Sequence, residues 1–411
     1  MSWVQSTLGE VADIFSGYAF KSADMNSEGG TPLIKIKNIA DSAVSHECDA
    51  FLNKDFNLAK FERFHLLRDD FLVAMTGQGS VGRIGKMRDY KPGFYVNQRV
   101  AIVRVNPEKA NPVFIFYQIA TRSNELELFK KANGAGQPNI SAKQIGELPV
   151  VLPSTEQQQY IADVLSSYDD LIENNQKQIK LLEEAAQRLY KEWFVDLRFP
   201  SHETTPIVDG VPEGWTYKPF SEVFDYVRGK SYTSKELSDT TGILMANLKN
   251  IRAFGGYNRN AEKRFTGQYK ANQMLYAGDI VMGVTDMTQE RRLVGHVALV
   301  PDLGEKMTFS MDLIKIIPKL TDNLFLYSAM YYGGLSKQIS PLANGVNVLH
   351  LKPEAMMGIE MLTPTKDILE RYHQQFAPMV TRIEALQKQC DVAAEARDRL
   401  IPKLMNREIE V

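Results

Sequence analysis

A glycine-rich stretch is the first feature of this sequence that could do chemistry. Gly77, Gly79 and Gly82 have the spacing of a dinucleotide-binding fingerprint. That fingerprint needs a helix directly after its last glycine, so that the helix N-terminus faces the phosphates. Residues 83–86 instead read as a strand, and they lack the Lys and the Ser or Thr of a P-loop. The stretch therefore predicts a glycine-rich loop and not a nucleotide site.

Other sequence patterns typical of catalytic sites are also absent or incomplete. The acidic pair Asp302 and Glu305 has the wrong spacing for a nuclease carboxylate cluster, and a turn is the better interpretation. The sequence has neither the Asn-Pro-Pro-Tyr nor the Asp-Pro-Pro-Tyr motif of adenine methyltransferases. Its six histidines form no local ligand pair, and its two cysteines lie far apart in unlike segments. We therefore expect no catalytic residue, no metal ion and no cofactor bound by this chain.

A basic segment in the second half is the densest signal for nucleic acid. Between residues 249 and 270, cations that could hold phosphates alternate with aromatic residues that could approach bases. A solvated surface loop is the alternative interpretation. The candidate DNA-binding residues here are Lys249, Arg252, Tyr257, Arg259, Lys263 and Arg264, and the weaker equivalents in the first half are Lys35 and Lys37.

Two further pairs of polar loops are candidates for reading bases. Glutamine can pair with adenine and arginine with guanine in the major groove. The first pair contributes Gln78, Ser80, Arg83 and Lys86, and, in the second half, Gln289, Arg291 and Arg292. The other pair, rich in Asn and Gly, contributes Asn133, Gln137, Asn344 and Asn347, and could be a positioning turn or merely a hairpin. Any exposed loop diverges as these do, so divergence alone does not establish base contact.

An internal repeat shows which elements must position these loops. Trp3 recurs as Trp215, and the triplet Lys-Asn-Ile at residues 37–39 recurs at 249–251, each 212 residues later. Ala-Asn-Gly at 132–134 recurs at 343–345, at an offset of 211. The chain is therefore two copies of one unit. Each copy begins with short strands and few helices, the latter including residues 113–121 and 324–332.

Each copy ends in a long helix with a heptad seam. In the first copy, core-like residues alternate at spacings of four and three from Ile161 to Trp193, and the second copy keeps this phase from Tyr372 to Leu404. Helices of matched length and register should pair with each other. The polar seam residues Asn175 and Arg397 are expected to fix the register at some cost in stability. Antiparallel pairing would relate the two copies by an approximate two-fold axis, as suits two separated half-sites on DNA.

Composition limits the class of protein. The 411 residues are 44% hydrophobic and 24% charged with a net charge of −2, which predicts an ordinary globular protein and not a uniformly basic DNA-coating one. The N-terminal residues have no basic start followed by an apolar run, and no window approaches the roughly 18 apolar residues of a membrane span. We expect a cytoplasmic protein with no membrane partner.

The pattern resembles the specificity subunits of Type I restriction-modification systems over essentially the whole chain. Three features carry the resemblance: Leu-Gly-Glu-Val at residues 8–11 after the opening Trp, with Phe-Ser-Glu-Val at 220–223; Ile-Gly-Glu-Leu-Pro at 145–149; and the helix endings at 189–194 and 400–405. The second copy has Ile-Glu-Met at 359–361 and lacks the Leu-Pro.

The resemblance implies an α+β fold with two mixed α/β target-recognition domains, at residues 1–153 and 201–364, and spacer helices at 154–200 and 365–411. The helices would pair as an antiparallel coiled coil, giving an internal pseudo-two-fold repeat. The implied partners are double-stranded DNA with a bipartite target, two methylation subunits that use S-adenosylmethionine, and restriction subunits that use ATP and Mg²⁺. The chain itself would be non-catalytic. The alternative from another class is a coiled-coil scaffold with two protein-binding modules.

Overall fold

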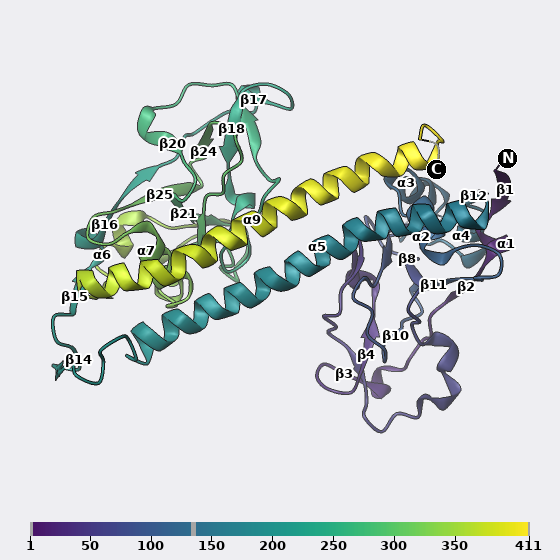
Figure 1. The fold of residues 1–411 in the computed structure, drawn as a ribbon, viewed down its shortest axis with the longest axis horizontal. Coiled ribbons are helices and arrows are strands. Elements are labelled where there is room, and N and C mark those ends of the chain that lie inside the picture. Colours follow the sequence, from purple (N-terminus) through teal and green to yellow (C-terminus); the bar gives the residue numbers. More distant parts are fainter. Residues whose placement is uncertain (1–2, 133–136, 410–411) are drawn as a thin grey trace. The chain divides into compact units, whose positions relative to one another are not determined.

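A computed structural model describes residues 3–132 and 137–409 of the chain (Figure 1). By internal contacts the chain divides into two compact units. The first unit comprises Met1–Gln176 and Lys388–Val411, and the second comprises Lys177–Gln387. Each unit therefore contains one globular domain and a part of both long helices.

The first unit is built on a six-stranded sheet with the order β2-β11-β8-β9-β6-β5 and a four-stranded sheet with the order β10-β4-β7-β3. Its central strands β8 and β11 are almost wholly buried, as their runs of Val, Ile, Leu and Phe require. The strands are β1 (Val4–Thr7), β2 (Ala12–Ser16), β3 (Met25–Asn26), β4 (Thr31–Ile34), β5 (Ile39–Ala40), β6 (Ser42–Val44), β7 (Phe51–Leu52), β8 (Phe71–Ala74), β9 (Ile84–Lys86), β10 (Tyr95–Val96), β11 (Val100–Val105) and β12 (Pro149–Leu152). The short helices are α1 (Leu8–Val11), α2 (Pro112–Ile119), α3 (Arg122–Lys131) and α4 (Ala142–Gly146).

The second unit repeats this plan with sheets of order β16-β25-β21-β23 and β17-β19-β18-β24-β20. Its strands are β13 (Ile207–Val208), β14 (Val211–Pro212), β15 (Thr216–Pro219), β16 (Phe224–Arg228), β17 (Leu237–Ser238), β18 (Ile243–Ala246), β19 (Lys263–Phe265), β20 (Met274–Leu275), β21 (Ile280–Gly283), β22 (Thr285–Asp286), β23 (Val297–Leu299), β24 (Met307–Phe309), β25 (Leu313–Pro318), β26 (Leu349–His350) and β27 (Glu360–Thr363). Its short helices are α6 (Phe220–Val223), α7 (Asn323–Tyr331) and α8 (Ser336–Ile339). Helices α2 and α7 confirm the two helices expected at 113–121 and 324–332.

Strand register shows that the repeat seen in the sequence is structural. In the first unit Val4 of β1 pairs with Leu152 of β12, and in the second Thr216 of β15 pairs with Thr363 of β27. These four residues are related by the repeat offsets of 212 and 211. A shift of the register by one residue would move every side chain of a strand to the opposite face of the sheet. The shared register therefore means that equivalent positions of the two copies lie on equivalent faces.

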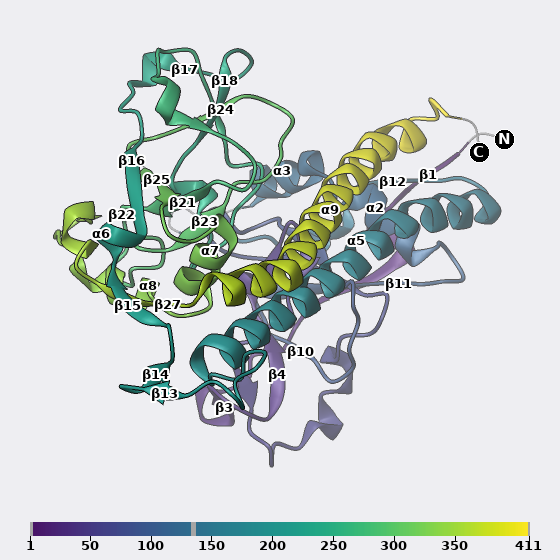
Figure 2. The same cartoon turned by 60° about the vertical axis from the view of Figure 1, so that its left-hand side comes forward.

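The two long helices are α5 (Thr155–Tyr190), which ends in a π-helical turn (Lys191–Val195), and α9 (Lys366–Met405). In the first unit Asp169 and Asn175 of α5 contact Arg397 and Gln389 of α9. In the second unit the rings of Tyr190 and Tyr372 lie 6.4 Å apart. Residue numbers rise on one helix as they fall on the other, so within each unit the pairing is antiparallel, as expected (Figure 2).

The heptad seam packs into the cores of the globular domains. Ile161 and Leu165 of α5, together with Leu404 of α9, join the main core of the first unit. In the second unit Tyr372 and Phe376 of α9 are almost fully buried in an aromatic core. Each domain is therefore fixed to the helix segments of its own unit by apolar burial. None of the helices in the described part of the chain is both long and apolar enough to span a membrane.

Candidate nucleic-acid interface

Two polar loops distant in the sequence lie together in the first unit. The glycine-rich loop at residues 77–82 contacts residues 137–139, where the backbone N–H of Gly77 donates to the carbonyl of Pro138 at 3.2 Å. Thr76 and Asn139 form an isolated β-bridge beside this contact. Gln78 and Gln137 are exposed, whereas Ser80 and Arg83 are partly buried. We call residues 77–82 and 137–139 the first loop cluster. Asn133 lies outside the described residues.

The second unit brings the equivalent loops together. Strands β22 and β26 pair, and they carry the loops at residues 287–292 and 344–347. The Gln289 side chain joins these loops directly, because its Nε2 donates to the Val346 carbonyl at 2.8 Å. Asn344 and Asn347 are exposed beside it. The structure thus brings together the two candidate loop pairs, which are far apart in the sequence.

A third loop completes this group in the second unit. The N–H of Phe254 donates to the carbonyl of Arg292 at 2.7 Å, and that of Gly256 donates to Val297 at 2.8 Å. We call residues 252–256, 287–292 and 344–347 the second loop cluster. Its exposed side chains mix cations, amides and large apolar groups, which are the types used for phosphates, bases and thymine methyls. They are Arg252, Phe254, Met287, Gln289, Arg292, Asn344, Val346 and Asn347.

Buried Asp286 shapes the second loop cluster. Its Oδ2 accepts the N–H of Leu293 at 2.6 Å, and its Oδ1 accepts the N–H and the hydroxyl of Thr288, each at 2.8 Å. Burial opposes the charged carboxylate, but these donors outweigh it and hold the pKa of Asp286 below its ordinary value. Asp286 is not among the residues predicted from the sequence. An Asp two residues before a Thr in a polar loop is the signal that predicts such a turn.

The basic segment at 249–270 is not one continuous cationic surface, and two of its candidates need correction. Tyr257 is 8% exposed, and its ring packs in the core of the second unit with its hydroxyl on the Met307 sulfur. The Arg259 side chain is 9% exposed and forms a 2.8 Å ion pair with Glu384 of α9. These two side chains are therefore occupied by packing and by a helix contact, and we remove them from the interface.

The other cations of the candidate set differ in how far acids neutralise them. Arg264 forms two hydrogen bonds with Glu305, and Lys263 donates to the Tyr232 hydroxyl at 2.9 Å. Arg292 pairs with the neighbouring Glu290, and Lys249 is exposed. Arg291 is partly buried and has a left-handed φ of 53°. In the first unit, Asp49 pairs with both Lys35 and Lys37, and Asp69 pairs with Lys86.

A cleft of about 470 Å³ lies beneath the third loop of the second unit. The rings of Tyr327, Tyr331 and Tyr332 line it, and Glu183 of α5 faces Arg252 there. Burial raises the pKa of Glu183, and the positive charge of Arg252 partly opposes this. In the described residues no cluster of three or more His, Cys, Asp or Glu side chains is arranged to hold a metal ion. The glycine-rich loop leads into strand β9, which confirms that it does not open a nucleotide-binding helix.

Comparison with known proteins shows what this chain is similar to. Residues 1–184 match the model of the Type I restriction modification DNA specificity domain. The MjaIX specificity subunit of Methanocaldococcus jannaschii is 27% identical over 320 residues, which cover 72% of this chain and 69% of that protein. The HindI specificity subunit of Haemophilus influenzae is 22% identical, with 99% of both proteins covered. The chain is therefore similar to Type I restriction-modification specificity subunits over most of its length.

The fold agrees with this similarity. The crystal structure of a Type I specificity subunit from M. genitalium matches with a TM-score of 0.61 at 14% identity, covering 98% of this chain and 96% of that one. The expected fold class is therefore confirmed. The chain has two mixed α/β domains with the same strand register, and two long helices that pair antiparallel within each unit. The exposed polar loops are therefore the features of this site that a function has to explain.

Proposed function

We propose that this chain is a non-catalytic specificity subunit that reads a bipartite double-stranded DNA target, one half with each loop cluster. One observation carries the proposal: both units bring the same two loops together on the same framework, while the residues in these loops differ. Gln78 and Gln137 are exposed in the first cluster, and Gln289, Arg292 and Asn347 in the second. Two domains that recognise different half-sites need the same framework with different polar residues in the loops that contact the bases.

The reactions belong to partners in this proposal. Two methylation subunits would transfer the methyl group of S-adenosylmethionine to adenine, and restriction subunits would use ATP and Mg²⁺, with the whole complex working in the cytoplasm, where the DNA is. Support for a non-catalytic role comes from the described residues, among which the candidate side chains are loop amides and cations rather than a nucleophile with an oriented base.

The test uses the subunit in complex with its methylation subunits. Sequencing of methylated DNA should give a target of two specific halves with an unread spacer. A variant with Gln289→Ala, Arg292→Ala and Asn347→Ala should relax one half only and leave the other half and the spacer unchanged. A complex without any sequence preference would favour the scaffold alternative, in which the two domains bind proteins.

A further inference from the structure

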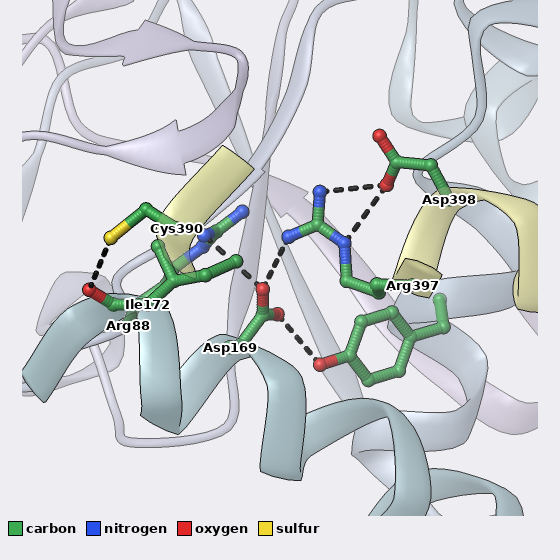
Figure 3. Close-up of polar contacts among 7 residues, drawn as sticks. Arg88, Asp169, Ile172, Cys390, Arg397 and Asp398 are labelled. Carbon is green, nitrogen blue, oxygen red and sulfur yellow. Dashed lines mark hydrogen bonds and ion pairs between the residues drawn. The ribbon is translucent and has the colours of Figure 1, made fainter. Parts of the chain in front are cut away.

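A buried carboxylate joins three parts of the first unit. Asp169 of α5 accepts a 2.7 Å hydrogen bond from the Tyr117 hydroxyl of α2 and forms a 3.2 Å ion pair with Arg88, which follows β9 (Figure 3). It also pairs with Arg397 of α9, whose guanidinium contacts Asp398 as well. Two of these contacts come from the globular domain and one comes from the partner helix. We call Arg88, Tyr117, Asp169 and Arg397 the Asp169 node.

The side chains of the Asp169 node are largely shielded from solvent, and most of their polar atoms have a partner. Asp169 is 9% exposed, and the side chain of Arg397 is 14% exposed. With Asp398 included, two arginines face two aspartates, so the charges balance. Burial, together with the nearby Asp169 charge, raises the pKa of Tyr117 and keeps its hydroxyl a donor. Because a buried ionic group costs desolvation, it is a poor source of stability but a strict determinant of geometry.

The second unit shows that the fold does not require this node. At the repeat offset of 211, Ser328, Val380 and Ala186 take the positions of Tyr117, Asp169 and Arg397. Pro301 follows β23 by two residues, as Arg88 follows β9. Pro301 and Val380 line the cleft of the second unit, and Ser328 accepts a 2.9 Å hydrogen bond from Tyr372. In the second copy these four positions carry no charged side chain, and the ion pair between domain and helix lies elsewhere, between Arg259 and Glu384. A feature present in one copy alone points to a role beyond folding.

The Asp169 node is connected to strand β9, which lies next to the glycine-rich loop of the first loop cluster. Arg88 comes two residues after β9 (Ile84–Lys86), and β9 directly follows the glycine-rich loop of the first cluster. Met87, between β9 and Arg88, is buried. Anchoring Arg88 on α5 therefore restrains the strand and its loop relative to the helix segments of the same unit.

We propose that Asp169 is a positioning residue for target specificity, which fixes the angle of the first recognition domain on its helices and so restricts the accepted spacer to one length. This inference rests on the proposed bipartite reading. Asp169 need not touch DNA. Its loss should change how far apart the half-sites can lie, and it should leave the bases read in each half unchanged.

The experiment compares Asp169→Asn with Asp170→Asn, its exposed neighbour on the same helix, each in complex with the methylation subunits. Methylation rates are measured on DNA with the native spacer, with spacers one base pair longer or shorter, and with single base changes in each half. For Asp169→Asn, the preference for the native spacer should fall about tenfold, whereas the penalty for each base change stays as in the unmodified complex. Asp170→Asn should match the unmodified complex throughout.

Two results would overturn the inference: an unchanged spacer preference in the folded Asp169→Asn complex, or an equal loss of discrimination against base changes. If Asp169→Asn does not fold, Tyr117→Phe combined with Arg88→Met gives the same test, because it cuts the domain contacts and keeps the Asp169 to Arg397 pair between the helices. An unmodified complex with no sequence preference would instead overturn the proposed function itself.

Discussion

The side-chain amide of Asn175 donates a 3.2 Å hydrogen bond to Oε1 of Gln389, which joins the two long helices inside the first unit. Asn175 is 2% exposed and occupies a seam position between apolar neighbours. A buried amide in such a seam lowers stability relative to leucine, but it penalises every register in which it lacks a partner. The pair therefore selects one antiparallel alignment.

Replacing Asn175 with leucine should stabilise the protein and weaken this selection. We expect the free energy of unfolding to rise by about 1 kcal/mol, since an apolar side chain suits the site and Gln389 remains exposed to water. Urea unfolding of the two proteins measures the change. The matched control is Asn174→Leu at the exposed neighbouring position, which should give no gain. A loss of stability in Asn175→Leu would show that the amide pair is a net stabilising contact.

This pair illustrates how much the sequence could predict. Heptad spacing identified Asn175 and Arg397 as polar seam residues, because helical periodicity depends on residues a few positions apart. Their partners Gln389 and Asp169 were not predicted, because each lies in a distant segment and only the packed structure brings it close. The same holds for Arg88, which pairs with Asp169. The same limit explains Tyr257 and Arg259: local composition indicated a basic aromatic loop, whereas burial in the core and Glu384 on α9 decide where these side chains go.

The salt dependence of DNA binding should separate exposed cations from paired ones. Lys249→Ala should weaken binding to all sequences and reduce the magnitude of the slope of log K against log salt by about one. Arg259→Ala should leave that slope unchanged and instead destabilise the second unit by about 2 kcal/mol, because Glu384 loses its ion-pair partner. Salt titrations of binding and urea unfolding measure the two effects. A reduced slope for Arg259→Ala would return that residue to the interface.

Acid should loosen the second loop cluster through Asp286. The folded pKa of this group is below its ordinary value of 3.8, so its stabilising contribution is complete above that pH and is lost as the pH falls through the folded value. Amide hydrogen exchange at Thr288, Leu293 and Val294 should therefore be protected at neutral pH, and this protection should be lost only as the pH falls below 3.8 through the folded pKa of Asp286. Asp286→Asn should lose this protection at neutral pH and weaken DNA binding. The exposed Asp239→Asn serves as the control, and protection that persists in Asp286→Asn would exclude the anchoring role.

Shortening both long helices should shorten the accepted spacer. Residues 174–180 of α5 and 382–388 of α9 are opposite heptads, to judge by the contacts of Asn175 with Gln389 and Gln178 with Arg382. Removing both heptads preserves the phase of the seam and takes about 10 Å from each helix, at roughly 1.5 Å per residue. Since base pairs are spaced by about 3.4 Å, the preferred spacer should fall by about three base pairs. Methylation of DNA with graded spacers, in complex with the methylation subunits, measures the preference. Removing four residues from each helix is the control, because it breaks the heptad phase and should abolish recognition instead of shifting it. If the full-heptad deletion yields a folded complex with its original spacer, the helices do not set that distance.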